Sequence, residues 1–140
     1  MSNICAGIGV GQLEVLEERV KRKREIFNLY KKELAVIKEI SFLEEDNDSY
    51  SNYWLTTILI NKNSTIDREQ LRLHLEQNNI ESRPLWKPMH LQPVFHGCTS
   101  YINGVSEEFF NTGLCLPSGT NMKEEDLKRV IDRIKELYEI

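Results

Sequence analysis

The chain has 140 residues, a length that fits one domain or one part of a larger protein. Hydrophobic residues make up 40% and charged residues 29%, which is ordinary for a soluble globular chain. The net charge of −4 argues against a general nucleic-acid binder, and no apolar run approaches the roughly 20 residues of a membrane-spanning helix. Because no basic segment followed by an apolar block marks a secretory signal, we expect a cytoplasmic protein.

Cysteines and histidines are too few and too scattered to predict a metal site. The three cysteines, Cys5, Cys98 and Cys115, give neither a disulfide framework nor a zinc signature. His90 and His96 lie near Cys98 in the sequence, but this spacing matches no standard metal pattern. We therefore expect no bound metal.

The first third of the chain has a helical period. Apolar residues recur at three-, four- and seven-residue steps from Leu13 to Leu34, which predicts one long helix over about residues 4–34. Gly7, Gly9 and Gly11 interrupt its start. They do not match a phosphate loop, because no strand precedes them and the third glycine position is missing. We read residues 1–34 as an inter-domain type of helix that needs a closely packed partner.

A basic cluster, residues 21–24, lies within this helix, with glutamates on both sides. On a helix its four charges point in different directions, and glutamates four positions earlier, such as Glu17 and Glu18, are available as partners. A solvated helix face is therefore a better interpretation than a phosphate-binding patch.

The next segments predict a strand and a helix after an acidic loop. Residues 44–52 are acidic and polar and predict a surface loop, whereas residues 53–60 are aromatic and β-branched and predict a buried strand. Asp67 and Gln70 form a capping box for a second helix, which buries Leu71 and Leu75.

The last part of the chain alternates short strands and helices. Strands are predicted at 80–85 and 114–116, and a short helix begins at Ser106. A capping box of Asn121 and Glu124 begins the last helix, which ends near residue 138. The predicted fold class is α+β, with a short, mostly antiparallel sheet and helices on one face.

The most informative segment is residues 83–95, which holds three of the four prolines. Proline fixes φ and lacks a backbone donor, so the segment is neither an ordinary helix nor a central strand. It also carries several polar and aromatic side chains, namely Arg83, Trp86, Lys87, His90 and Gln92. A rigid, irregular, polar segment is typical of a binding loop. The alternative is a connection between two elements, with Trp86 and Phe95 in the core.

The residue chemistry alone names no reaction. The sequence shows no Ser/His/Asp order, paired carboxylates, phosphate loop or metal cluster. Arg83 and Lys87 are suited to a carboxylate or a phosphate, and Trp86 to a base, a sugar or a cofactor ring.

Three stretches together resemble the C-terminal domain of the DegT-type (DegT/DnrJ/StrS) nucleotide-sugar aminotransferases, which use pyridoxal phosphate. They are residues 1–13, similar to the entry into the long inter-domain helix of the family; residues 82–95, similar to a loop of members that act on UDP-4-keto-6-deoxy sugars; and residues 116–119 with the last helix. The resemblance covers essentially all 140 residues.

The resemblance implies the small C-terminal domain of a fold-type I pyridoxal phosphate-dependent transferase. Residues 1–140 are then a single domain, and the large domain that carries the Schiff-base lysine is missing. We therefore expect no catalytic residue in this chain, pyridoxal phosphate only in the complete enzyme, and no transamination by the chain alone. Family members are usually twofold dimers, so a homodimer is implied as well.

The reaction implied for the whole enzyme transfers an amino group, usually from glutamate, to a nucleotide-linked 4-keto-6-deoxy sugar for surface glycan synthesis. The resemblance implies that the nucleotide is UDP. By the resemblance, Arg83, Trp86, Lys87 and His90 are the side chains nearest the substrates. Simpler roles remain open for three of them: Arg83 pairing with Glu81, Trp86 in the core, and His90 tying down its loop. Alternatives for the whole chain are a standalone binding or interaction module, a structural fragment without activity, and a regulatory homologue without transaminase activity.

Overall fold

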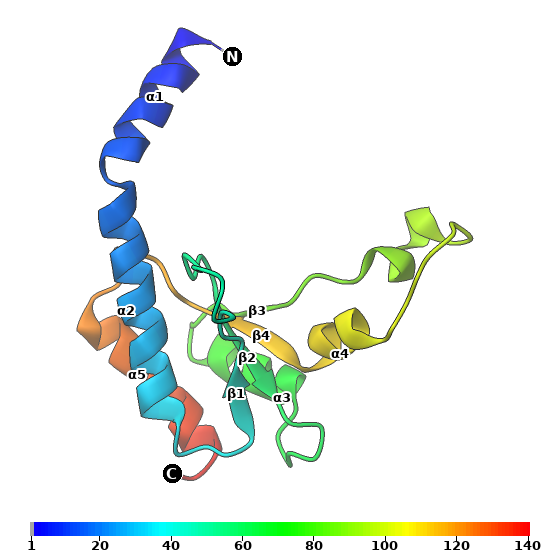
Figure 1. Cartoon of the computed structure of the whole chain (residues 1–140). Helices are drawn as coiled ribbons and strands as arrows, with labels where there is room; N and C mark the ends of the chain where they lie inside the picture. The colour runs from blue at the N-terminus through cyan, green and yellow to red at the C-terminus, as the bar shows by residue number, and fades with distance from the viewer. Residues whose placement is uncertain (1) are drawn as a thin grey trace.

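A computed structural model describes residues 2–140 (Figure 1). The elements in chain order are α1 (Asn3–Glu14), α2 (Leu16–Leu34), β1 (Ile40–Phe42), β2 (Thr56–Ile60), α3 (Arg68–Gln77), β3 (Arg83–Pro84), η1 (Met89–Leu91), η2 (Pro93–Phe95), α4 (Val105–Thr112), β4 (Gly113–Leu116) and α5 (Glu124–Leu137), where η marks a 3-10 turn. No helix among the described residues is both long and apolar enough to cross a membrane.

The sheet has four strands in the order β1-β2-β4-β3, and every neighbouring pair is antiparallel. Ile58 of β2 lies opposite Phe42 of β1 and Leu114 of β4, which fixes the register of β1, β2 and β4. The predicted α+β class and the mostly antiparallel sheet are confirmed.

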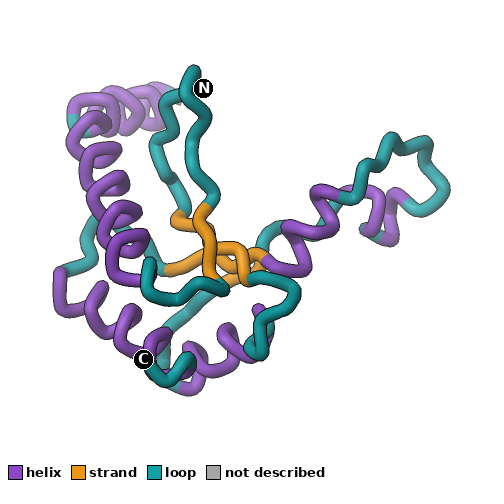
Figure 2. Tube along the Cα trace, turned by 60° about the horizontal axis from the view of Figure 1, so that its bottom comes forward, coloured by secondary structure: helices purple, strands orange, loops and turns teal. Residues whose placement is uncertain are grey.

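Three helices, α2, α3 and α5, cover one face of this sheet (Figure 2). Alternate residues of the strands, such as Ile58 and Leu114, meet the apolar stripes of the helices because successive side chains of a strand point to opposite faces. The stripe of α5 is the clearest, with buried residues at helical spacing: Leu127, Val130, Ile131 and Ile134.

The long N-terminal helix is not continuous, so that part of the prediction is wrong. The chain leaves helical geometry at Val15, with φ −110° and ψ 3°, and α1 bends away from α2 (Figure 1). None of the α1 side chains from Asn3 to Glu14 is buried, so no packing within the described chain holds the helix straight.

The capping box of α3 is confirmed: Gln70 N–H donates to the Asp67 carboxylate and the Asp67 N–H donates to the Gln70 side chain, both at 2.8 Å. Two other predicted starts are wrong. α4 begins after Gly104, whose φ of +82° suits glycine, and α5 begins after Lys123.

The strand predictions also needed correction. β2 begins at Thr56 and β3 is only Arg83–Pro84, so both are shorter than expected. Pro84 lacks an N–H for the ladder, and this limits β3 to a short edge strand. The sequence did not predict β1, because its three residues, Ile40–Phe42, show no pattern that distinguishes a strand from a connection.

Candidate functional site

The proline-rich segment forms an arm that projects from the sheet (Figure 1). We call residues 85–104 the arm. It leaves β3, turns twice at η1 and η2, and returns to α4. Pro88 and Pro93 begin the two turns, and Gln92 before Pro93 is extended at φ −80° and ψ 135°, as expected for a residue before proline.

Much of the apolar surface of the arm is exposed. The exposed side chains are Trp86, Met89, Leu91, Val94, Tyr101 and Ile102. An exposed apolar group of this extent is typical of a surface that meets a ligand or another protein surface. The arm is therefore the part of the chain best suited to a binding role.

Arg83 lies at the base of the arm, and its side chain is 79% exposed. Its guanidinium donates two hydrogen bonds to one oxygen of Glu81, at 2.5 and 2.7 Å, so the simpler role left open for Arg83 is what the structure shows. An ion pair this exposed contributes little to stability, and an incoming anion can replace Glu81 at small cost. Lys87, further along, is exposed.

His90 anchors the arm to α4. Its Nε2 atom lies 2.8 Å from Oε1 of Glu107, and its side chain is largely covered. The arrangement matches the simpler role of tying down the loop. His90 therefore fixes the position of the arm relative to α4.

Trp86 is not in the core, so that alternative is wrong. Its side chain is 67% exposed and stacks on Trp54, with ring centroids 6.3 Å apart and planes inclined by 29°. Trp54 was expected in a buried strand, but it precedes β2 and is 63% exposed. The sequence carried no signal for this pairing, because the two tryptophans lie far apart in it.

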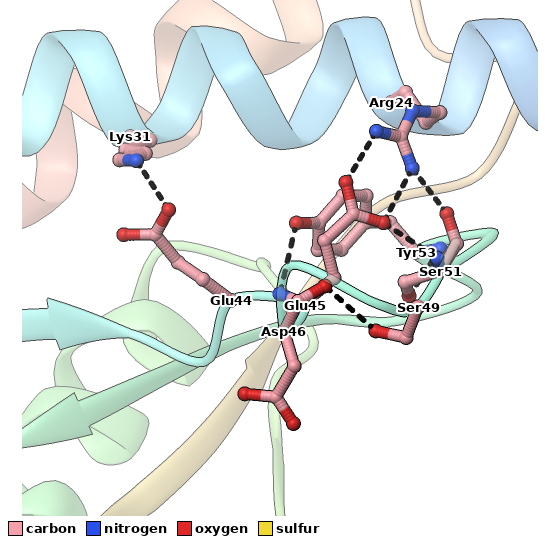
Figure 3. Close-up of polar contacts among 8 residues, drawn as sticks. All are labelled: Arg24, Lys31, Glu44, Glu45, Asp46, Ser49, Ser51 and Tyr53. Atoms are coloured by element: carbon pink, nitrogen blue, oxygen red, sulfur yellow. Dashed lines mark hydrogen bonds and ion pairs between the residues drawn. The ribbon is translucent and has the colours of Figure 1, made fainter.

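The loop that carries Trp54 is fastened to α2 by Arg24 (Figure 3). We call residues 44–55 the acidic loop. Arg24 donates two hydrogen bonds to the carboxylate of Glu45, at 2.6 and 3.0 Å, and one to the carbonyl of Ser51. The same carboxylate accepts the Ser51 N–H at 2.6 Å. Arg24 thus closes the loop into a fixed shape.

The basic cluster on α2 therefore makes tertiary contacts instead of forming only a solvated face. Besides the contacts of Arg24, Arg22 donates to the carbonyl of Met122 at 2.8 Å, and Lys23 donates to the carbonyl of Trp54 at 2.8 Å. These three cations hold loops against the helix, and the prediction of a solvated face is wrong for them.

Tyr53 fixes the backbone directly before Trp54. Its φ of +43° is unfavourable for a residue with a side chain, and contacts on both sides compensate for the strain. Its ring stacks on Phe27 at 3.8 Å, and its hydroxyl accepts the N–H of Glu45 at 3.3 Å (Figure 3). The neighbouring Trp54 N–H donates to the side chain of Asn52 at 2.9 Å. These contacts fix the backbone from which the Trp54 indole projects.

We expect the fastening of the acidic loop to fail only in strong acid. The hydrogen bond from Arg24, followed by that from Ser51, lowers the pKa of Glu45 from 4.5 to about 2. A lowered pKa in the folded state means that the stabilisation is complete above pH 4.5 and is lost as the pH falls toward 2. An NMR titration of the Glu45 carboxyl carbon measures this midpoint directly.

The matched comparison for this prediction is Glu44→Gln against Glu45→Gln. Glu44 pairs with Lys31 at the surface and has no second partner among the described contacts. Only Glu45→Gln should flatten the dependence of unfolding free energy on pH between 4.5 and 2. Equal acid dependence in the two variants would contradict the assignment.

A cavity of about 510 Å³ opens beside Trp54, with Lys23, Ser82, Arg83 and Arg129 also in its wall. Burial lowers the pKa of Lys23. The hydroxyl of Ser82 is buried and has no hydrogen-bond partner among residues 2–140. Cationic and hydroxyl groups with unused donors line a space large enough for a small-molecule ligand.

The structure thus divides the four predicted binding residues. Arg83 lines the cavity, and Trp86 stacks on Trp54, which also lines it. Lys87 and His90 do not line the cavity. Sequence reasoning missed Lys23, Trp54 and Ser82. Within residues 2–140, no group of three potential metal ligands comes together.

Comparisons of this chain with known proteins point to one family of aminotransferases. The model of the DegT/DnrJ/EryC1/StrS aminotransferase family matches residues 1–135. A protein of Bacillus subtilis (strain 168), EpsN, which bears the name of a pyridoxal phosphate-dependent aminotransferase, is 43% identical over 99% of this chain and 36% of its own length. GDP-perosamine synthase of Vibrio cholerae is 34% identical over 99% of this chain and 38% of its own length.

A solved structure agrees with the fold. The sugar aminotransferase Spr1654 of Streptococcus pneumoniae, in its PLP-form, superposes with a TM-score of 0.85 at 22% identity, over 99% of this chain and 36% of that one. The chain therefore spans a little over a third of the length of these relatives. Because the family model matches almost the whole chain, the protein belongs to the DegT/DnrJ/EryC1/StrS aminotransferase family.

Proposed function

We propose that this chain is the C-terminal domain of a pyridoxal phosphate-dependent aminotransferase that acts on a nucleotide-linked 4-keto-6-deoxy sugar. The observation that carries the proposal is the family match over residues 1–135. The amino donor is glutamate, and the product serves surface glycan synthesis. The cytoplasmic location remains a prediction from the sequence.

The described residues do not fit pyridoxal phosphate by themselves. The cofactor supplies an electron sink for amino-group transfer and needs a lysine free to bond to it. Lys23, the lysine in the cavity wall, has its ammonium engaged with the carbonyl of Trp54. We propose that the cofactor-binding lysine belongs to a separate large domain, and no chemical step is attributed to this chain.

The contribution of this chain is one wall of the substrate cleft. Arg83 offers an exposed cation whose present partner is replaceable, and Trp86 offers an exposed ring. Lys87 adds a second cation on the arm, and His90 holds the arm to α4. The proline-rich loop resembles that of enzymes for UDP-linked sugars, whereas a relative is named for a GDP-linked one, so both nucleotides belong in the test.

The exposure of α1 supports a domain of a larger enzyme over a standalone module. Its apolar side chains Ile4, Ile8, Val10 and Leu13 are 59–76% exposed. A helix with exposed apolar residues on this scale is suited to cover by another surface. We propose that the large domain and the second subunit of a homodimer cover it.

The proposal is tested in the complete enzyme with Arg83→Gln and His90→Gln. Loss of a charge-assisted hydrogen bond to substrate corresponds to about a tenfold to hundredfold loss of kcat/KM. Arg83→Gln should act mainly through KM for the sugar nucleotide, and His90→Gln should lower kcat/KM by disturbing the arm. Assays with UDP- and GDP-linked 4-keto sugars identify the nucleotide.

The matched control is Arg72→Gln on α3, where the arginine pairs with neighbouring glutamates of the same helix and with no other carboxylate of residues 2–140. This variant should retain the kcat/KM of the parent enzyme. If Arg83→Gln and His90→Gln also retain it, the arm does not face the substrate and the assignment of the cleft fails.

A further inference from the structure

We propose that Trp54 and Trp86 form the stacking surface for the base of a nucleoside diphosphate, whose phosphates lie in the adjoining cavity against Lys23, Ser82 and Arg83. The inference rests on the proposed function and deepens it. It assigns a binding role to three residues that sequence reasoning did not select, Lys23, Ser82 and Trp54.

The indole pair has the exposure and order that a stacking surface needs. Trp54 and Trp86 come from different segments, their ring centroids lie 6.3 Å apart, and both residues are more than 60% exposed. Holding two large apolar rings in order at the surface costs conformational entropy, and the small area that they bury against each other offsets little of this cost. Stacking with a base covers that area, and it accepts any base because each has a π face.

The turn before β2 holds Trp54 in advance of binding. Lys23 donates to the Trp54 carbonyl, and Asn52 accepts its N–H at 2.9 Å. The strained φ of Tyr53 and the contacts of Arg24 fix the preceding backbone. A backbone ordered in this way loses little further freedom on binding, which improves affinity.

The cavity beside Trp54 holds donors whose capacity is unused. An ammonium has three donors, and the hydrogen bond of Lys23 goes to a neutral carbonyl. The buried Ser82 hydroxyl has no partner within residues 2–140. The oxygens of a diphosphate can accept from both groups and supply the counter-charge that the desolvated Lys23 lacks.

The acidic groups of the cavity do not oppose an anion strongly. The two acidic residues of its wall, Glu81 and Asp126, are outnumbered by three cations, Lys23, Arg83 and Arg129. The volume of about 510 Å³ lies within the usual range for small-molecule sites.

The experiment uses tryptophan fluorescence of the 140-residue chain, because Trp54 and Trp86 are its only two tryptophans. UDP and GDP are titrated separately, and inorganic pyrophosphate is added as a competitor. We expect saturable quenching by both nucleotides, and displacement of both by pyrophosphate. Quenching that rises without saturation, or no quenching, would overturn the proposal.

Variants separate the stacking surface from the phosphate site. Trp54→Leu should weaken nucleotide binding about tenfold, read from the remaining Trp86, and leave direct pyrophosphate binding by calorimetry unchanged. Ser82→Ala removes no hydrogen bond within residues 2–140, so the fold is expected to stay intact, and it should weaken pyrophosphate binding severalfold.

The matched control is Lys21→Gln, an exposed neighbour of Lys23 on α2. It should bind like the parent chain, whereas Lys23→Gln should lose affinity for pyrophosphate. Parental nucleotide affinity in Trp54→Leu overturns the stacking role. Parental pyrophosphate affinity in both Ser82→Ala and Lys23→Gln overturns the phosphate site.

Failure of the nucleotide site and failure of the proposed aminotransferase function give different results. Turnover of keto sugars by the complete enzyme, together with unsaturable quenching in this chain, removes only the nucleotide site. Saturable nucleotide binding, together with a complete enzyme that transfers no amino group to any keto sugar, removes the proposed function.

Discussion

Gly113→Ala is expected to lower the free energy of unfolding by about 1–3 kcal/mol and to displace the base of the arm. A Cβ atom at this position would collide with the side chain of Leu85 and would lie 2.5 Å from the carbonyl oxygen of Phe109. The Leu85 side chain can rotate, but the carbonyl belongs to the backbone of α4 and can move only if the helix end moves.

The matched control is Gly9→Ala on α1, where an added Cβ meets nothing within 4 Å. Alanine favours the helix over glycine by about 0.5–1 kcal/mol, so this variant should be at least as stable as the parent. Urea unfolding monitored by circular dichroism gives both values. A neutral Gly113→Ala would mean that the junction of β4 with the arm is looser than described.

Leu114→Ala is expected to have the larger effect on stability, a loss of about 2–5 kcal/mol. Leu114 is fully buried on β4, between β2 and β3, and belongs to the cluster that joins the sheet to the covering helices. Truncation removes apolar burial and leaves a cavity that the central strands cannot easily close. A loss of this size is a large fraction of the stability of a small domain.

Leu73→Ala provides the comparison, because Leu73 is 43% exposed on α3. Its unfolding free energy should differ from that of the parent by less than about 0.5 kcal/mol. The same urea experiment applies to both variants. Equal losses would show that the cluster around Leu114 is not the main source of stability.

The parts of the fold predicted from sequence are those with a repeating pattern. α3 and α5 follow from helical spacing and, for α3, from the Asp67–Gln70 capping box, because these features depend on neighbours in the sequence. β1 has three residues, too few for an alternating pattern to appear. The break at Val15 depends on what packs against α1, which local preference does not encode.

The candidate site was predicted less completely, because its residues meet through tertiary contacts. The proline-rich segment indicated the arm, since proline acts locally. The stacking of Trp54 on Trp86 and the fastening of the acidic loop by Arg24 join segments that are distant in sequence. The basic cluster looked solvated because its partners, such as Glu45, belong to another segment.

The most direct test of the account compares amino transfer by this chain with amino transfer by the complete protein encoded at its locus. Each is supplied with pyridoxal phosphate, glutamate, and a UDP- or GDP-linked 4-keto-6-deoxy sugar, and the amino sugar is measured by mass spectrometry. The account predicts the amino sugar from a complete protein that carries a cofactor-binding lysine domain, and none from the 140-residue chain. Amino transfer by the 140-residue chain alone, or none by the complete protein, would contradict it.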